Sequence, residues 1–261
     1  MAEEAKKAEL SIEEVLASTS IADVYQAAKQ LDGVAAKTHL IESPYLSDLC
    51  GNNVYLKPEN LQNTGSFKLR GAYNKISQLN EDERKRGVIT ASAGNHAQGV
   101  AFAARALNCK AVICMPATTP ILKVEATRAY GAEVVLYGDS FDDAYAKSLE
   151  LQKKKGYVYI HPFNDQKVLA GQGTTALEII DELKDVDAIL VPIGGGGFAS
   201  GVALATKAVN PNVKVIGVEP EGAPCMEKSF MEGHITTLSA VDTVADGCAV
   251  KTPGDLTYAF C

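Results

Sequence analysis

One lysine of this sequence stands where an amine could act as a nucleophile. Lys68 follows the turn residues 63–65 (N-T-G) and belongs to the stretch 66–72 (S-F-K-L-R-G-A). Apolar residues recur downstream at helical spacing (Leu69, Ala72, Tyr73 and Ile76), so a helix is predicted to begin near Ser66. The positive end of a helix dipole disfavours an ammonium group, so Lys68 in a first turn would lose its proton easily. We therefore consider Lys68 a candidate for Schiff-base chemistry, with an ordinary surface lysine as the alternative.

A second stretch, residues 92–96 (S-A-G-N-H), lies where a predicted strand at residues 88–91 passes into a predicted helix at residues 96–107. Ligands of open parallel sheets bind beyond the carboxyl ends of the strands, next to helix amides that have no intrahelical partner. This loop could therefore present several N–H groups to an anion. The alternative is a simple helix cap made by the side chain of Ser92 or Asn95.

Four consecutive glycines, residues 194–197, form the third stretch, between a predicted strand at residues 188–192 and a predicted helix at residues 198–209. Without side chains, the backbone of this loop can wrap closely around a phosphate, and the dipole of the following helix favours the anion. Four glycines also carry an entropy cost that a plain connection would avoid. The composition thus indicates a phosphate site that requires no lysine or arginine.

A dinucleotide site is the competing interpretation of the glycine loop. Gly194, Gly196 and Ala199 match the pattern G-x-G-x-x-A, and Glu219 ends the next predicted strand about twenty residues later, where a ribose-binding acid is expected. Such a motif usually opens a chain, however, and here it comes late. It would also leave the other two stretches without a role, so we favour the phosphate interpretation.

Together and in this order, the three stretches resemble the fold type II pyridoxal-phosphate enzymes, most of all the threonine ammonia-lyases, with the serine racemases as near relatives. The resemblance extends from about residue 12 to residue 261, and the joint occurrence of the three motifs makes it specific. It implies that Lys68 binds pyridoxal 5′-phosphate covalently. The implied phosphate site consists of Gly194, Gly195, Gly196 and Gly197. The implied site for the substrate carboxylate consists of Ser92, Ala93, Gly94, Asn95 and His96.

The resemblance gives roles to further residues. Phe67, which precedes the lysine, matches an aromatic residue that packs on one face of the cofactor. Gly247, in the stretch 246–250 (D-G-C-A-V), matches the glycine that lines the other face. Asn95 matches a residue that hydrogen-bonds the 3′ oxygen of the cofactor. His96 is expected to support the structure, because the lysine can already act as the base.

Serine racemases bind a divalent cation through a glutamate, a backbone carbonyl and an aspartate. Glu219 and Ala223 match the first two ligands, whereas Cys225 replaces the aspartate. A hard cation prefers oxygen ligands, so we expect no metal site here, and a structural partner for Glu219 instead. The other histidines show no metal-binding spacing: His39, His161 and His234.

The implied reaction is the dehydration and deamination of L-threonine to 2-oxobutanoate and ammonia, with L-serine giving pyruvate. In this scheme the freed amine of Lys68 removes the α-proton of the substrate, and the cofactor stabilises the resulting charge. The family includes enzymes of isoleucine biosynthesis, which carry an additional regulatory domain. Two alternatives remain open. One is a racemase, and the other is a module that binds the cofactor without turning over substrate.

The elements around these motifs alternate regularly between strands and helices, which predicts an α/β protein with parallel sheets covered on both faces. The resemblance implies two parallel-sheet, three-layer domains, the smaller inserted in the larger. We place the large domain at residues 1–80 and 165–261 and the small one at residues 81–164. Serine and glutamate in the stretch 11–14 predict a capping box, and the charged residues 81–86 predict a solvated turn.

Composition excludes several classes of protein. The chain has 261 residues, a net charge of -7 and 46% hydrophobic residues, which is typical of a soluble globular protein and argues against a nucleic-acid partner. The most apolar stretch, residues 188–205, contains Pro192 and the four glycines, so we expect no membrane span. Six cysteines without a C-x-x-C pair, and a start without an apolar signal region, indicate the reducing cytoplasm. We also expect a homo-oligomer.

The last residues predict a helix that is too short to be stable alone. Residues 253–255 form a turn and cap, and residues 256–261 begin an apolar helix of less than two turns. Members of the resembled family continue beyond this point with further strand and helix and with a neutral partner for the pyridine nitrogen. We therefore expect a fragmentary form with one cofactor edge and one sheet edge uncovered, weak cofactor binding and a tendency to associate.

Overall fold

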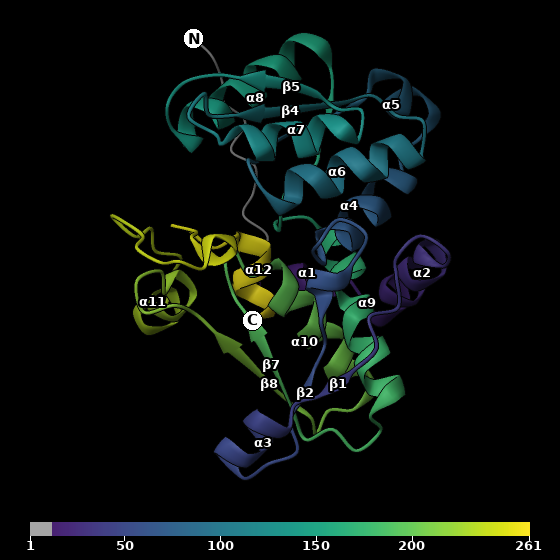
Figure 1. Cartoon of the computed structure of the whole chain (residues 1–261), viewed down its shortest axis with the longest axis vertical. Helices are drawn as coiled ribbons and strands as arrows, with labels where there is room; N and C mark the ends of the chain where they lie inside the picture. Colours follow the sequence, from purple (N-terminus) through teal and green to yellow (C-terminus); the bar gives the residue numbers. More distant parts are fainter. Residues whose placement is uncertain (1–11) are drawn as a thin grey trace.

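Residues 12–261 are described by the computed structural model, in which helices alternate with strands over most of this range (Figure 1). The predicted capping residue Ser11 lies outside the described residues. The strands are β1 (Ile41–Glu42), β2 (Tyr55–Leu56), β3 (Val88–Ala91), β4 (Ala111–Met115), β5 (Glu133–Leu136), β6 (Val158–Tyr159), β7 (Ala188–Pro192) and β8 (Lys214–Val218). The helices are α1 (Ile12–Ala17), α2 (Ile21–Leu31), α3 (Pro44–Cys50), α4 (Lys68–Ser77), α5 (Glu81–Arg86), α6 (Asn95–Ala106), α7 (Ile121–Ala129), α8 (Phe141–Lys155), α9 (Gln166–Glu182), α10 (Gly197–Val209), α11 (Cys225–Glu232) and α12 (Asp255–Phe260), with the 3₁₀ turns η1 (Glu59–Leu61) and η2 (Asp246–Cys248).

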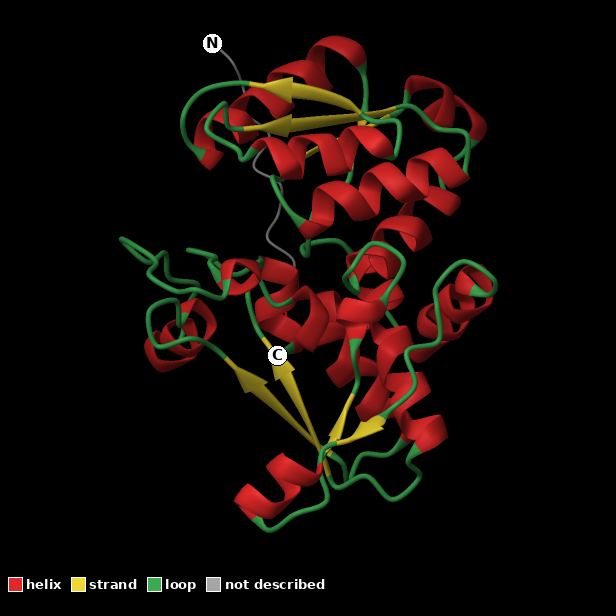
Figure 2. Cartoon of the chain, viewed as in Figure 1, coloured by secondary structure: helices red, strands yellow, loops and turns green. Residues whose placement is uncertain are grey.

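The larger sheet has four parallel strands in the order β5-β4-β3-β6, and helices lie on both sides of it (Figure 2). The two central strands are buried at every position, as expected for a sheet covered on both faces. One core, which includes Val100 of α6, Val124 of α7 and Ile113 of β4, fills one face. A second core, which includes Ala144 of α8 and Ile89 of β3, fills the other. The predicted parallel pairing of this region is confirmed.

Strands β7 and β8 form a separate parallel pair, with Ala188 opposite Lys214 and Pro192 opposite Val218. Their inner face packs in a core with α9 and α10, whereas Leu190 on the outer face is 65% exposed. A short ribbon of β1 and β2 is antiparallel, so the sheets are not all parallel. The division of the chain into two domains stays a prediction.

Some local predictions were wrong. The charged residues 81–86 form the helix α5 and not a solvated turn, because Asn80 and Glu83 make a capping box at its start. Acidic residues then fill the first turn and basic residues the last, which suits the helix dipole. Helix α9 begins at Gln166 because the Asp165 side chain accepts N–H groups of its first turn. Helices α3 and α11 were not predicted at all.

Helix α4, which carries Lys68 at its start, is anchored by buried charges. Arg70 is fully buried and forms ion pairs with Glu59 and Glu178. It also donates to the hydroxyl of Thr174, and Lys57 pairs with the same Glu178. Removing one partner of such a buried network leaves an uncompensated charge, which is costly. The network therefore holds α4 against α9 and the η1 turn.

Close backbone contacts fix the same helix from two sides. A Cβ atom added to Gly171 of α9 would lie 2.6 Å from the carbonyl oxygen of Arg70. A Cβ atom added to Gly99 of α6 would lie 3.0 Å from the carbonyl carbon of Lys68. Glycine at these positions lets both helices approach the backbone of α4. Within residues 12–261, no helix is long and apolar enough to cross a membrane.

Candidate active site

Lys68 is the first residue of α4, as the sequence predicts, and its side chain is partly buried. The Nζ atom donates a hydrogen bond to the backbone carbonyl of Pro162 at 3.0 Å and lies 5.2 Å from the centroid of the Phe67 ring. Burial lowers the pKa of the Lys68 amine to about 8, against a weaker opposite effect of Cys248. Roughly a tenth of this amine is therefore unprotonated at pH 7, far more than for an ordinary lysine, and a nucleophile or base requires this form.

The loop at residues 92–96 lies beside this lysine, because the loop leads into helix α6 and Gly99 of α6 packs against the Lys68 backbone. Gly94 is the N-cap of α6, and the carboxamide of Asn95 is exposed without a hydrogen-bond partner in the described part of the chain. The first-turn amides of α6 have no intrahelical acceptor, so they remain available to an anion.

His96 is 4% exposed, and its Nε2 lies 2.9 Å from the carbonyl oxygen of Ile160. A carbonyl only accepts, so Nε2 carries the hydrogen of a neutral ring. Burial, reinforced by the charge of Lys68, lowers the pKa of His96 to about 3. His96 therefore cannot exchange protons near neutral pH, in keeping with the expected supporting role.

The glycine loop at residues 194–197 connects β7 to α10 and has no room for side chains. A Cβ atom added to Gly195 would lie 2.4 Å from the ring of Phe163, and one on Gly197 would lie 2.8 Å from the Phe163 backbone. Gly196 has a φ of 93°, in the left-handed region, and its added Cβ would lie 2.7 Å from Cβ of Thr257. The packed neighbours thus explain why each position is glycine, and the backbone of the loop stays bare.

The carbonyl groups of this loop face inward to the protein. The Gly195 carbonyl accepts from the Thr257 hydroxyl at 2.6 Å, and the Gly194 carbonyl lies 3.5 Å from the Cys225 thiol. The N–H groups of Gly194, Gly195 and Gly196, by contrast, donate to no acceptor among residues 12–261. Free amides at the positive end of a thirteen-residue helix, here named the cradle, are the arrangement that favours an anion, as expected from the sequence.

Aromatic and glycine residues lie next to this cradle. The Phe67 ring stacks on the ring of Phe198 in α10, with centroids 4.0 Å apart and planes inclined by 10°. Gly247 lies against the loop, because a Cβ added to Gly194 would be 2.9 Å from the Gly247 carbonyl. A Cβ added to Gly247 itself would meet nothing within 4 Å, so space is open over this residue. Both residues predicted to flank the cofactor therefore adjoin the glycine loop.

Glu219 has a structural partner. Its carboxylate accepts the N–H groups of Met226 at 2.9 Å and Glu227 at 2.8 Å, at the start of α11. Ala223 and Cys225 are buried, and the thiol of Cys225 faces the glycine loop. No group of three or more histidine, cysteine, aspartate or glutamate side chains within residues 12–261 could hold a metal ion.

Sequence reasoning missed three contributors to the site: Pro162, Phe163 and Thr257. The Pro162 carbonyl accepts a hydrogen bond from the Lys68 amine, and Phe163 and Thr257 pack on the glycine loop. The stretch H-P-F-N-D between β6 and α9 was the available signal for the first two. Thr257 carries no signal of this kind, because its role depends on how α12 docks on the loop.

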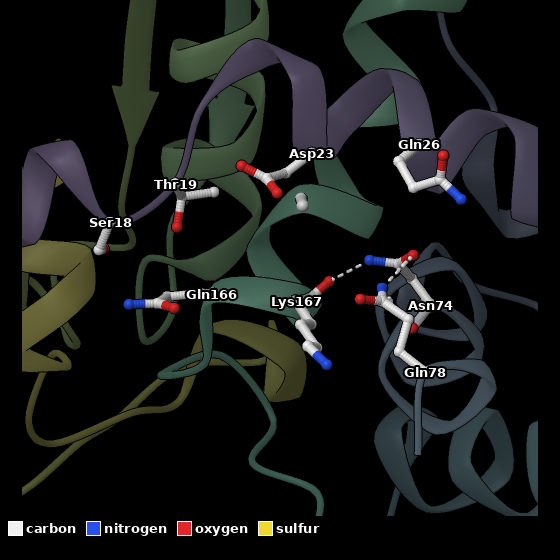
Figure 3. A pocket seen from close by; sticks show the side chains of 9 residues that line it. Ser18, Thr19, Asp23, Gln26, Asn74, Gln78, Gln166 and Lys167 are labelled. Atoms are coloured by element: carbon white, nitrogen blue, oxygen red, sulfur yellow. Dashed lines mark hydrogen bonds between the residues drawn. The ribbon is translucent and has the colours of Figure 1, made fainter. Parts of the chain in front are cut away.

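A separate polar cavity of about 100 Å³ lies between α2, α4 and α9 (Figure 3). Asn74 donates to the Lys167 carbonyl across it, and Gln78 donates to Asn74. The hydroxyl of Thr19 is buried there without a partner. None of the residues that line this cavity belongs to the three predicted motifs, so the chemistry is assigned to the surroundings of Lys68.

The residues around Lys68 fit pyridoxal phosphate. A bare cradle of free amides at a helix start suits the phosphate, and an amine with a lowered pKa suits the aldehyde. Open space over Gly247 leaves room for a flat ring. These three features belong to one region, because the η2 turn contains both Gly247 and Cys248, and Cys248 is close enough to Lys68 to affect the pKa of its amine.

Comparison with known proteins agrees with this geometry. A family model described as pyridoxal-phosphate dependent enzyme matches residues 31–261. An L-threonine ammonia-lyase of Thermotoga maritima is 52% identical over 239 residues, which cover 92% of this chain and 60% of the relative. The chain thus spans less than two thirds of the length of that relative.

Solved structures give the same picture. The processed form of threonine deaminase isoform 2 from Solanum lycopersicum superposes with a TM-score of 0.90 at 51% identity, covering 92% of this chain and 66% of that one. Maize serine racemase superposes with a TM-score of 0.89 at 36% identity, covering 92% and 73% respectively. The fold described above is therefore shared with both kinds of enzyme.

Proposed function

Because this chain belongs to the family of pyridoxal-phosphate dependent enzymes, we propose that it dehydrates and deaminates L-threonine to 2-oxobutanoate and ammonia. The observation that carries the proposal is the convergence on one lysine. Lys68 has a lowered pKa and lies beside the loop at residues 92–96, and the turn that holds its amine also packs on the glycine loop. The similarity to threonine ammonia-lyases supports the choice of substrate. It also favours this function over the dinucleotide interpretation.

The bound cofactor supplies a covalent attachment for the substrate amine and withdraws electrons from the α-carbon. Lys68 holds the cofactor between turnovers and, once displaced, its neutral amine accepts the α-proton. The amides of residues 194–197 would hold the phosphate of the cofactor, and Phe67 and Gly247 would lie next to its ring. The loop of Ser92, Ala93, Gly94, Asn95 and His96 binds the substrate carboxylate through amides at the start of α6.

Binding the carboxylate and the phosphate at two helix starts orients the substrate before reaction. The α-carbon would then face the Lys68 amine, whose lowered pKa leaves part of it free to take a proton. His96 is excluded from that role by its pKa of about 3 and by the hydrogen bond that occupies its Nε2. The β-hydroxyl then takes up a proton and leaves as water, and hydrolysis of the released enamine gives ammonia with 2-oxobutanoate from threonine or pyruvate from serine.

Serine racemization is a second candidate function. The observation that favours it is the likeness to maize serine racemase over 92% of this chain. In a racemase, a group on the second face of the substrate returns the proton. We keep L-threonine as the substrate because the threonine enzymes are more similar in sequence than the racemase, at 52% and 51% against 36% identity.

The finer organisation is also part of this proposal. We propose two parallel-sheet, three-layer domains, residues 1–80 with 165–261 and residues 81–164, the second inserted in the first. The four-stranded sheet with α6, α7 and α8 supports the smaller one. A homo-oligomer and a cytoplasmic location remain proposals, the latter supported by six free cysteines.

Product analysis tests the function. The 261-residue chain, supplied with pyridoxal phosphate and L-threonine, should release 2-oxobutanoate and ammonia in equal amounts. L-Serine should give pyruvate, and chiral chromatography should find little D-serine. D-Serine without 2-oxo acid would instead identify a racemase. Cofactor binding without any product would show a binding module and overturn the proposal.

A further inference from the structure

His161 begins the turn that connects β6 to α9, residues 161–164, here named the His161 turn. Its Nδ1 accepts two backbone N–H groups, from Phe163 at 3.3 Å and from Asn164 at 2.8 Å. A ring nitrogen that accepts carries no hydrogen, so the ring is neutral with its hydrogen on Nε2. This side-chain-to-backbone pattern is the one by which an asparagine shapes a turn, made here by a histidine.

Burial lowers the pKa of His161 to about 4, and the charge of Lys68 acts in the same direction. Asp165 and Asp255 face the same ring and oppose the shift without reversing it. Nδ1 is therefore free to accept across the neutral range. The ring also packs edge-on against Phe163, with centroids 4.7 Å apart.

The His161 turn contacts the site at several points. Its Pro162 carbonyl accepts the Lys68 amine at 3.0 Å. Its Phe163 fills the space beside Gly195 and Gly197 of the phosphate cradle. Asn164 accepts the N–H of Leu256 at 3.1 Å and so joins the turn to α12. The shape of this single turn thus sets where the lysine amine rests relative to the cradle.

We propose that His161 is a positioning residue for Lys68, because its Nδ1 folds the turn that holds the Pro162 carbonyl against the lysine amine. The inference rests on the proposed role of Lys68. A backbone carbonyl accepts from an ammonium and from a neutral amine alike. It can therefore hold the amine whenever the cofactor is not bonded to it, and return it to the same place in each turnover.

Three variants distinguish the effect of losing the acceptor at Nδ1 from the effect of losing the volume of the ring. His161→Asn places an oxygen near the position of Nδ1 and keeps both accepted hydrogen bonds. His161→Gln is equally polar, but its oxygen lies one methylene further away. His161→Leu removes the acceptor while keeping an apolar side chain. Because the Asn and Gln variants are both polar and of similar size, they remain comparable even if the Leu variant folds poorly.

The measurement is stopped-flow absorbance of pyridoxal phosphate mixed with the 261-residue chain after its cofactor has been removed. In the observed step, Nζ bonds to the aldehyde carbon and one water is lost. The cofactor concentration at half-saturation reports docking in the phosphate cradle, and the maximal rate reports the covalent step. Misplacing the amine should lower the maximal rate about tenfold or more while half-saturation changes little.

The expected order of maximal rates is unmodified chain, then His161→Asn close to it, then His161→Gln and His161→Leu well below. Equal rates for the Asn and Gln variants would overturn the inference. The inference would also be overturned if all three variants had a lower maximal rate and, to the same degree, a higher half-saturating cofactor concentration. Borohydride reduction and peptide mapping distinguish a failure of this inference from a failure of the proposed function. A cofactor adduct on another lysine would show that Lys68 does not bind the cofactor, so the proposed function would fail as well.

A second readout requires no cofactor. Nitrogen-15 NMR of the histidine-labelled chain should show His161 neutral at pH 6, with its hydrogen on Nε2 and with Nδ1 in a hydrogen-bonded, unprotonated state. The signal can be assigned by its loss in His161→Asn. A hydrogen on Nδ1 would be incompatible with the two accepted bonds and would overturn the inference.

Discussion

Lys68 combines two physical effects that act in the same direction. Its place at the start of α4 exposes it to the positive end of the helix dipole, which the sequence pattern already indicates. Burial, which depends on the surroundings of the fold, acts in the same direction and lowers the pKa to about 8. The Pro162 carbonyl then fixes the direction of the amine. Reactivity and position are thus supplied by different parts of the chain.

The lowered pKa gives Lys68 a characteristic pH profile. Only the neutral amine attacks the cofactor aldehyde, so the rate of covalent capture should rise about tenfold per pH unit below pH 8 and level off above it. An ordinary lysine would still gain rate up to its usual pKa of 10.5. The rate is measured by the absorption band of the bound cofactor between pH 6 and 10. Lys68→Ala should lose the band, whereas the exposed Lys85→Ala should keep it; a profile that climbs steadily through pH 10 would contradict the burial argument.

The site could be predicted from the sequence where its chemistry is local. Lys68 and the glycine loop were found because a helix start and a run of glycines leave direct traces in the residue order. Pro162 was missed because a backbone carbonyl has no sequence signal of its own. Thr257 was missed because its contact with Gly195 spans 62 positions and depends on the docking of α12. Long-range packing therefore limits what the sequence reveals about a site.

At the scale of elements, the same distinction holds. The alternation of strands and helices predicted parallel strands covered on both faces, and the four-stranded sheet has this arrangement, since buried parallel strands have a strong pattern. The helix at residues 81–86 was predicted as a turn because six charged residues show no apolar face. The capping box at its start and the favourable order of its charges stabilise the helix although it has no apolar face.

Gly196 should be the most sensitive position of the glycine loop. A Cβ there combines a φ of 93° with contacts of 2.7 Å to Met226 and Thr257. Gly196→Ala should therefore displace the loop and raise the half-saturating concentration of pyridoxal phosphate about tenfold or more. Pyridoxal, which lacks the phosphate, should be captured almost unchanged.

Gly233→Ala is the matched control, because Gly233 has a φ of 73° and nothing within 4 Å of an added Cβ. It should cost stability through backbone strain, yet leave cofactor binding intact. Equal effects of the two substitutions on cofactor binding would show that strain alone, and not the cradle, accounts for the loss.

The anchoring of α4 should depend on Arg70 more than on any exposed ion pair. Arg70→Met leaves Glu59 and part of Glu178 without a buried counter-charge, which should lower the free energy of unfolding by about 3–5 kcal/mol. Arg128→Met, which breaks an exposed pair with Glu125, should cost less than about 1 kcal/mol. Urea unfolding followed by circular dichroism measures both, and similar losses would contradict the anchoring role.

At the scale of the whole molecule, two neutral histidines lie near the same lysine, His96 buried and His161 partly buried. His96 and His161 have pKa values of about 3 and about 4, below the usual 6.5. The neutral ring of His96 donates to the Ile160 carbonyl, and that of His161 accepts the N–H of Asn164. Each bond holds a segment of the chain beside Lys68. The native state therefore binds fewer protons than the unfolded chain in mildly acidic solution, which couples the stability of the fold to pH.

This coupling predicts acid sensitivity in a defined window. The stabilisation is fully present above pH 6.5 and is lost progressively as the pH falls towards 4. Between pH 6.5 and 5, each histidine should cost about 2 kcal/mol of unfolding free energy. The effect of Lys68 is complete by about pH 8 and does not vary in this range, and the loss from Glu178, whose pKa is lowered chiefly by Arg70, begins only below 4.5. His96→Gln keeps a donor for the Ile160 carbonyl but cannot be protonated, so its urea midpoint should fall less steeply with pH. A variant whose midpoint follows the unmodified chain at every pH would rule out His96 as a source of the sensitivity.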